Sequence, residues 1–130
     1  MAGGFAPLKD IPKTMVYALA KFRNTVSEVI PERVISRPPT AELAPNQKDT
    51  DSLPPYDILD PILEQYIEKD LTPLQIANSK HDLLTVEKVA SLVNNNEYKR
   101  RQSAPGVRIT KRAFGRDRRF PITSKYSENI

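Results

Sequence analysis

The sequence predicts a mainly α-helical protein with long irregular loops. Apolar residues recur at spacings of three and four in three parts of the chain, which is the period of a helix that buries one face. Twelve prolines occur among 130 residues, and six of them lie between positions 31 and 55, which indicates irregular chain between the helices. Residues 107–110 are the one weak candidate for a strand.

The first helix is expected within residues 10–26. Asp10 can cap its N-terminus, and Pro12 suits the first turn because a backbone N–H is not needed there. The helix would carry one apolar face, made of Met15, Val16, Leu19, Ala20, Phe22 and Val26.

Residues 31–55 are expected to form a long proline-rich loop. A loop of this length in a compact domain is typical of a disordered segment or of an active-site lid. Within it, the hydroxyl of Thr40 would serve a turn or cap a short helical turn at 41–43. Residues 44–55 are predicted to be the least ordered internal segment, and 10–26 and 86–95 the most firmly helical.

Further helices are expected over about 57–95. Asp60 and Pro61 resemble a helix start inside a longer apolar pattern, so a kink or a restart is predicted there, with the helix ending near Lys69. Its apolar face would hold Ile62, Leu63, Tyr66 and Ile67.

Thr72 and Gln75 have the spacing of a capping box. Another helix carries Val86, Val89, Ala90, Leu92 and Val93 and fades at 94–96. His81 has no second ligand at a helical spacing, which favours an exposed residue over a metal or catalytic one.

The basic tail, residues 97–130, carries ten Lys or Arg and three acids, a net charge of +7 within a chain of net +4. Tyr98, Phe114 and Phe120 lie among these bases. The charge alone leaves three interpretations open, namely a solvated tail, a nucleic-acid-binding segment and a site for a small phosphate ligand.

Several short motifs follow one another in order along the chain. They are GGFAPLKD at 3–10, PKT at 12–14, IPERVI at 30–35, PTAEL at 39–43, QKDTDSLPPY at 47–56, EYKRRQ at 97–102, PG at 105–106, AFGRDRR at 113–119 and PIT at 121–123. Together they resemble the C-terminal part of the synthetase (ATP-pyrophosphatase) domain of the glutamine-dependent NAD⁺ synthetase family. The resemblance covers essentially the whole chain.

This resemblance implies that residues 1–130 are the C-terminal portion of an α/β synthetase domain of the Rossmann-like, adenine nucleotide α-hydrolase type. The family's Ser-Gly-Gly-x-Asp-Ser pyrophosphate loop and its nitrilase-like glutaminase domain do not occur in this sequence. The expectation is therefore a part of a carbon–nitrogen ligase that is inactive as an isolated chain.

The resemblance also implies the reaction and its ligands. Family members amidate deamido-NAD⁺ to NAD⁺ through an adenylate, using ATP with Mg²⁺ and ammonia from glutamine. Lys13 and Thr40 match the family's ATP contacts, and Tyr98 and Lys99 match its deamido-NAD⁺ contacts. No catalytic or metal-binding residue is assigned, because the metal ligands of the family lie upstream. The tail arginines are expected to pin the tail to nearby acids or to a partner subunit, namely Arg100, Arg101, Arg116, Arg118 and Arg119.

The implied partners are the remaining synthetase and glutaminase parts and further copies of the chain. The alternative is a non-catalytic basic fragment that binds nucleic acid or another anionic partner, which would not explain the ordered motifs outside the tail. The sequence has no cysteine and no apolar run near the roughly 18 residues of a membrane span. A cytoplasmic protein without membrane contact is expected.

Overall fold

The computed structural model describes residues 4–123, and its regular structure is helical. In chain order the elements are α1 (Lys13–Val26), α2 (Glu32–Ser36), η1 (Asp49–Asp51), α3 (Tyr56–Leu63), η2 (Glu64–Glu68), α4 (Pro73–Ala77), α5 (Leu83–Asn95) and α6 (Glu97–Gln102). Within residues 4–123 no β-strand forms, and the strand predicted at 107–110 is irregular chain. Gly3 and the end of the predicted basic tail, residues 124–130, lie outside the described residues.

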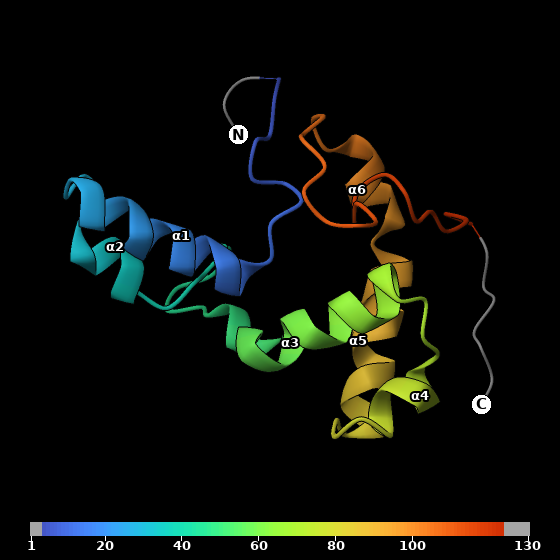
Figure 1. Ribbon diagram of the computed structural model, residues 1–130. Coiled ribbons are helices and arrows are strands. Elements are labelled where there is room, and N and C mark those ends of the chain that lie inside the picture. The colour runs from blue at the N-terminus through green and yellow to red at the C-terminus, as the bar shows by residue number, and fades with distance from the viewer. Residues whose placement is uncertain (1–3, 124–130) are drawn as a thin grey trace.

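The hydrophobic core lies between α3–η2, α4 and α5 (Figure 1). Its fully buried apolar side chains include Ile62, Ile76, Val86 and Val89. Burying each such side chain stabilises the fold by about 1.5–3 kcal/mol. Phe114 and Phe120 pack against this core from the segment that follows α6, residues 104–123, which we call the C-terminal segment.

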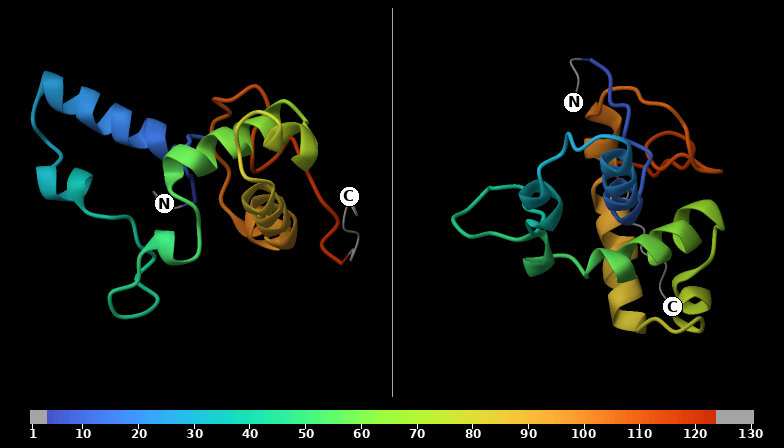
Figure 2. Two further views of the ribbon diagram at one scale, coloured as in Figure 1. Left: turned by 90° about the horizontal axis from the view of Figure 1, so that it is seen from below. Right: turned by 60° about the vertical axis from the view of Figure 1, so that its left-hand side comes forward.

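Helix α1 stands apart from this core. Figures 1 and 2 show α1 and α2 projecting to one side of the other helices. No residue of α1 is buried, and the predicted apolar face is exposed at Met15, Leu19, Phe22 and Val26, by 45–72%. The sequence pattern therefore marks a face that the described part of this chain leaves uncovered.

The helix starts differ from those predicted. Helices α1, α2 and α3 each begin directly after a proline. The side chain of this N-cap residue makes no hydrogen bond that caps the helix. Proline holds φ near the helical value, so it can begin a helix without a polar cap. The prediction that Asp10 caps α1 is wrong, because its carboxylate binds the C-terminal segment instead.

The prediction of a cap at Asp60 is also wrong. Helix α3 begins at Tyr56, so Asp60 and Pro61 lie inside it. The chain then continues as a π-helical turn, η2, in which the N–H of Lys69 donates to the carbonyl of Glu64 at 3.2 Å. Proline has no backbone N–H, so Pro61 itself donates no hydrogen bond within α3. The restart expected at Pro61 does not occur, because α3 runs through Pro61 and the helix type changes at Glu64.

The predicted capping box at Thr72 is confirmed. The N–H of Gln75 donates to Thr72 Oγ1 at 3.4 Å, and the N–H of Thr72 donates to Gln75 Oε1 at 2.9 Å. Helix α5 is capped by Asp82, whose carboxylate accepts from the N–H of Thr85 at 2.9 Å.

Two segments departed from their predicted conformation. The short helical turn at 41–43, one of the two roles left open for Thr40, does not form, and Glu42 has a left-handed φ of 53°. The predicted proline-rich loop instead contains α2 and the 3₁₀ turn η1. The basic tail, for which no helix was predicted, begins with a new helix, α6.

Candidate functional site

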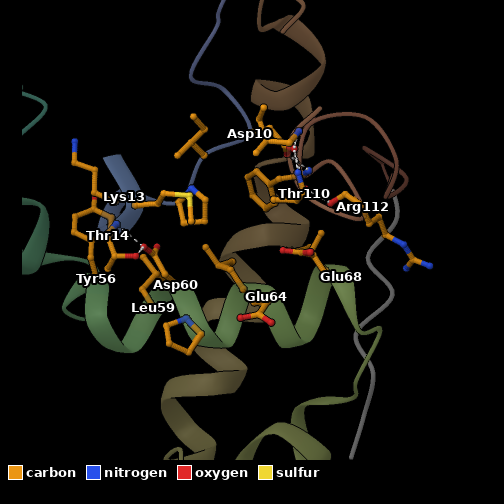
Figure 3. A pocket seen from close by; sticks show the side chains of 18 of the residues that line it. Asp10, Lys13, Thr14, Tyr56, Leu59, Asp60, Glu64, Glu68, Thr110 and Arg112 are labelled. Carbon is orange, nitrogen blue, oxygen red and sulfur yellow. Dashed lines mark hydrogen bonds between the residues drawn. The ribbon is translucent and has the colours of Figure 1, made fainter. Parts of the chain in front are cut away.

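The candidate site is a cavity of about 580 Å³ (Figure 3). It lies between the start of α1, the α3–η2 helix and the C-terminal segment. Its apolar wall includes Ile11, Met15, Leu59, Leu63, Ile67 and Phe114, and its polar groups include Lys13, Thr14, Asp60, Glu64, Glu68 and Thr110. Segments at opposite ends of the chain therefore form one site.

Asp10 closes one end of this cavity. Its Oδ2 accepts from the N–H groups of Ile109 and Thr110 and from Thr110 Oγ1, each at 2.8 Å, and its Oδ1 accepts from the N–H of Phe114 at 3.0 Å. The carboxylate belongs to a residue that is 6% exposed. Burial alone would raise the pKa of Asp10, but these hydrogen bonds lower it below its usual value, so the group stays charged.

Lys13 and Thr14 form the other end. Asp60 Oδ2 accepts from both the N–H and the Oγ1 of Thr14 at 2.8 Å, which satisfies a free donor in the first turn of α1. Lys13 is the first residue of α1, and its Nζ lies 5.8 Å from the ring centroid of Tyr17 and 6.0 Å from that of Tyr56. Aromatic faces attract an ammonium group, so these two rings favour side-chain conformations that place Lys13 Nζ near them.

Thr40 is not brought to this cavity. It lies half-buried in the irregular loop, and its Oγ1 accepts from the N–H of Glu42 at 3.0 Å. This hydrogen bond matches the turn role that the sequence left open for Thr40. The lining of the cavity contains Lys13 but not Thr40.

Tyr98 and Lys99 form a second, separate group on α6. Tyr98 is 44% exposed, and Lys99 Nζ lies 5.9 Å from the centroid of its ring. Neither residue lines the cavity beside Lys13. Lys99 lies within α6, in its last turn, where the helix dipole favours a cation.

Glu97 holds α6 in place and was missed by the sequence reasoning. It is 1% exposed, and its carboxylate binds Arg100 at 2.5 Å, Arg101 at 3.0 Å and Arg119 at 3.5 Å. Burial opposes the charge, but the hydrogen bonds to Arg101 and Arg100 lower the pKa of Glu97 to about 2. An acid three and four residues before two arginines was the available signal, because these spacings share one helix face.

The tail arginines pair with acids much as expected. The expectation is confirmed for Arg100, Arg101 and Arg119 on Glu97 and for Arg118 on Asp70 at 2.6 Å. Arg116 makes no ion pair within residues 4–123. Asp117 Oδ2 lies 3.6 Å from the guanidinium group of Arg108. Most of the tail's charge is therefore engaged within the chain.

A model of the NAD synthase family matches residues 1–103. This chain belongs to the NAD synthase family. Among curated relatives, the glutamine-dependent NAD⁺ synthetase of Acinetobacter baylyi is 62% identical over 126 residues, which are 95% of this chain and 23% of the relative. That of Aquifex aeolicus is 54% identical over 126 residues, which are 97% of this chain and 22% of the relative.

A solved structure gives the same result for the family assignment. It is the glutamine-dependent NAD⁺ synthetase from Acinetobacter baumannii in complex with ADP, at a TM-score of 0.57 and 52% identity. The match covers all of this chain and 22% of that one. The chain therefore spans less than a quarter of the length of these three members of the NAD synthase family.

No described helix is long and apolar enough to cross a membrane. No three or more His, Asp or Glu side chains in the described part of this family member gather where they could hold a metal ion. His81 is half-buried, with its Nε2 3.4 Å from Gln65 Nε2.

Proposed function

We propose that this chain forms part of the synthetase domain of a glutamine-dependent NAD⁺ synthetase and is incomplete on its own. The observation that carries the proposal is similarity along nearly the whole chain, at 62% and 54% identity, to a limited part of two such synthetases. A solved relative was obtained with ADP, which supports a nucleotide site in the same protein family.

The proposed reaction is the ATP-dependent amidation of deamido-NAD⁺. A carboxylate is a poor electrophile, and transfer of AMP to its oxygen, with release of pyrophosphate, provides a better leaving group. Ammonia, supplied from glutamine, then displaces AMP to form the amide of NAD⁺. The protein must hold two polyanions in reacting geometry, which favours fixed lysine and arginine side chains.

Lys13 is proposed to contact the phosphates of ATP. It is the first residue of a 14-residue helix, where free backbone N–H groups favour an anion. Thr40 is proposed as a second ATP contact, reached through movement of its loop. Tyr98 and Lys99 are proposed to bind deamido-NAD⁺, since both are exposed on α6 and Lys99 offers a cation beside an aromatic ring.

Mg²⁺ is proposed to arrive with ATP as its substrate complex. The described residues supply no converging set of acids for it, so its protein ligands are assigned to another part of the synthetase. No step of the proposed reaction is therefore assigned to a metal site in this chain.

The exposed apolar face of α1 supports the proposal that other protein parts pack against this chain. Four large apolar side chains at 45–72% exposure on one helix would be costly to leave in water. We propose that the rest of a Rossmann-like α/β synthetase domain, joined to a glutaminase domain, and further copies of the chain make up the working assembly. Because ATP and deamido-NAD⁺ are intracellular metabolites, a cytoplasmic location is part of the proposal.

A chimeric enzyme tests the proposal. The matched residues of the Acinetobacter baylyi synthetase are replaced by this chain, and NAD⁺ formation is followed with ATP, Mg²⁺, deamido-NAD⁺ and glutamine or ammonia. We expect the chimera to make NAD⁺, and the isolated 130-residue chain neither to make NAD⁺ nor to hydrolyse glutamine. A folded but inactive chimera would contradict the proposed function, and steady turnover by the isolated chain would contradict its incompleteness.

Substitutions in the same chimera test the two lysine assignments. Losing a charged hydrogen bond costs about 1.5–3 kcal/mol, so Lys99→Ala should raise the KM for deamido-NAD⁺ roughly ten- to hundred-and-fifty-fold. The KM for ATP should stay nearly unchanged. Lys13→Ala should show the opposite bias, and Lys21→Ala, at an exposed position of the same helix, is the matched control. If Lys99→Ala leaves both constants within about twofold, Lys99 is a surface lysine.

A further inference from the structure

We propose that Asp10 is a positioning residue for Lys13, and that the C-terminal segment thereby becomes a supporting part of the ATP-phosphate site. The inference rests on the proposed function, in which Lys13 contacts ATP. The family model ends at residue 103, so residues 104–123 lie beyond the part of the chain that it matches. Their role has to come from their contacts.

The first contact is the carboxylate of Asp10. All four of its hydrogen bonds come from Ile109, Thr110 and Phe114, about a hundred positions away in sequence. Only Ile11 and Pro12 separate Asp10 from Lys13. Proline has a fixed φ, here −56°, so this short connection has little freedom. Fixing Asp10 therefore limits where α1 can begin.

The second contact involves the backbone before Asp10. The N–H of Ala6 donates to the carbonyl of Pro105 at 2.8 Å, and Lys9 Nζ donates to the carbonyl of Ala104 at 3.0 Å. Gly106 packs so closely here that a Cβ atom would stand 2.4 Å from the carbonyl oxygen of Ala6. Residues 6–10 are thus held to the C-terminal segment at several points.

The third contact holds the residue that follows Lys13. Asp60, in α3, binds the N–H and hydroxyl of Thr14 at 2.8 Å. Figure 3 shows these two anchors, Asp10 with Thr110 and Asp60 with Thr14, on either side of the cavity. In the sequence, Lys13 therefore lies between Asp10, which is bound by the C-terminal segment, and Thr14, which is bound by α3. Without the Asp10 carboxylate, residues 6–9 keep their contacts through Ala6 and Lys9, but the start of α1 loses its anchor nearest to Lys13 on the N-terminal side and can pivot about Asp60.

Kinetics of the chimeric synthetase test this role. Because a small displacement of a binding group weakens its contact steeply, Asp10→Ala should raise the KM for ATP on the order of tenfold. The KM for deamido-NAD⁺ should remain unchanged. Asp10→Asn keeps an acceptor oxygen and should give an intermediate value. Gly106→Ala should also raise the KM for ATP, because the added Cβ atom would push the C-terminal segment away from Ala6 while Asp10 itself stays unchanged.

Asp117→Ala is the matched control. Asp117 lies in the same C-terminal segment and accepts from the N–H of Ala113 at 2.9 Å, but its described hydrogen bonds and ion pairs do not reach residues 4–15. It should leave the KM for ATP within about twofold of the parent value. An equal rise with Asp117→Ala would show general loosening of the segment and would overturn the positioning role.

Amide exchange in the 130-residue chain gives a readout that needs no catalysis. Asp10→Asn should accelerate exchange at Thr110 and Phe114 and also at Thr14 and Val16 in the first turn of α1. Asp117→Ala should leave Thr14 and Val16 unchanged. Unaltered protection of Thr14 and Val16 in Asp10→Asn would show that the two segments are not coupled, and the inference would fail.

The two proposals fail in different ways. If Lys13→Ala raises the KM for ATP and neither Asp10→Asn nor Gly106→Ala does, Asp10 does not position Lys13 and the proposed function stands. If Lys13→Ala has no effect, the ATP assignment is wrong and this inference falls with it. If Asp10→Ala does not fold, Asp10→Asn and Gly106→Ala decide the question in the same way.

Discussion

At the residue scale, three carboxylates each join parts of the chain that the sequence separates. Asp10 binds the C-terminal segment, Asp60 binds the first turn of α1, and Glu97 binds Arg119 as well as two arginines of its own helix. Each carboxylate stabilises the folded chain only while it is ionised and its hydrogen-bond donors are in place. Acid should therefore affect this protein first through such groups, and Glu97 is the clearest case.

We predict that Glu97→Gln destabilises the chain in a pH-dependent way. Folding lowers the pKa of Glu97 from 4.5 to about 2, which corresponds to about 3 kcal/mol of stability at roughly 1.4 kcal/mol per pKa unit. This stability is fully present above the unfolded pKa and is lost as the pH falls through the folded pKa. The difference in unfolding free energy between parent and variant should thus be largest above pH 4.5 and shrink towards pH 2.

Denaturant unfolding at a series of pH values checks this prediction. Glu28→Gln, at an exposed position with no ion pair within residues 4–123, is the control and should follow the parent at every pH. A Glu97→Gln variant that matches the parent near neutral pH would show that the three arginines are held without this carboxylate.

At the element scale, helix α5 and the loop before α3 differ most in how deeply their residues are buried. Four residues of α5 are buried, Val86, Val89, Ala90 and Val93, whereas the loop is largely exposed and held by local hydrogen bonds. Helix α1 lies between these cases, because it is regular but buries no side chain in the described chain. Regular backbone geometry and burial are thus separate contributions to local stability.

We predict the order of amide exchange in the 130-residue chain from this difference. Residues 86–95 should exchange most slowly, the amides of α1 faster, and residues 44–55 fastest of the three. Exchange followed by NMR gives the rate at each residue. Protection of 44–55 equal to that of 86–95 would mean that the loop packs more tightly than its contacts indicate.

At the scale of the whole molecule, the positive charge of the tail is largely used inside the chain. Glu97 and Asp70 together bind five arginines, which are Arg100, Arg101, Arg112, Arg118 and Arg119. The guanidinium group of Arg118 also lies 4.3 Å from the ring centroid of Tyr66 and donates to the backbone carbonyl of that residue. Arginines held in this way are not free to follow a phosphate backbone.

We therefore predict only weak nucleic-acid binding without sequence preference. Binding of labelled duplex and single-stranded oligonucleotides by the isolated chain is measured at low and physiological salt. Because the remaining contacts are electrostatic, affinity should fall steeply as salt is added. Submicromolar, sequence-selective binding at physiological salt would favour the alternative, in which the chain is a nucleic-acid-binding fragment.

Much of the fold followed from local sequence patterns. The apolar spacing of α5, the capping box at Thr72 and the face of Ile62, Tyr66 and Ile67 were predictable because each depends on residues within a few positions. The choice of residues for the candidate site came from the resemblance to the NAD synthase family. The cavity itself was not predictable, because its walls come from both ends of the chain.

The sequence by itself determined the helical character of the chain and the C-terminal ends of α1, η2 and α5. Tertiary structure decided what Asp10 and Asp60 bind. Each looked like a cap for the helix nearest in sequence, yet each binds donors 46 or more positions away. A carboxylate accepts from any suitably placed N–H, and local sequence shows only the nearest candidates. Which donor it reaches depends on the folded positions of α1, α3 and the C-terminal segment, which only long-range packing sets.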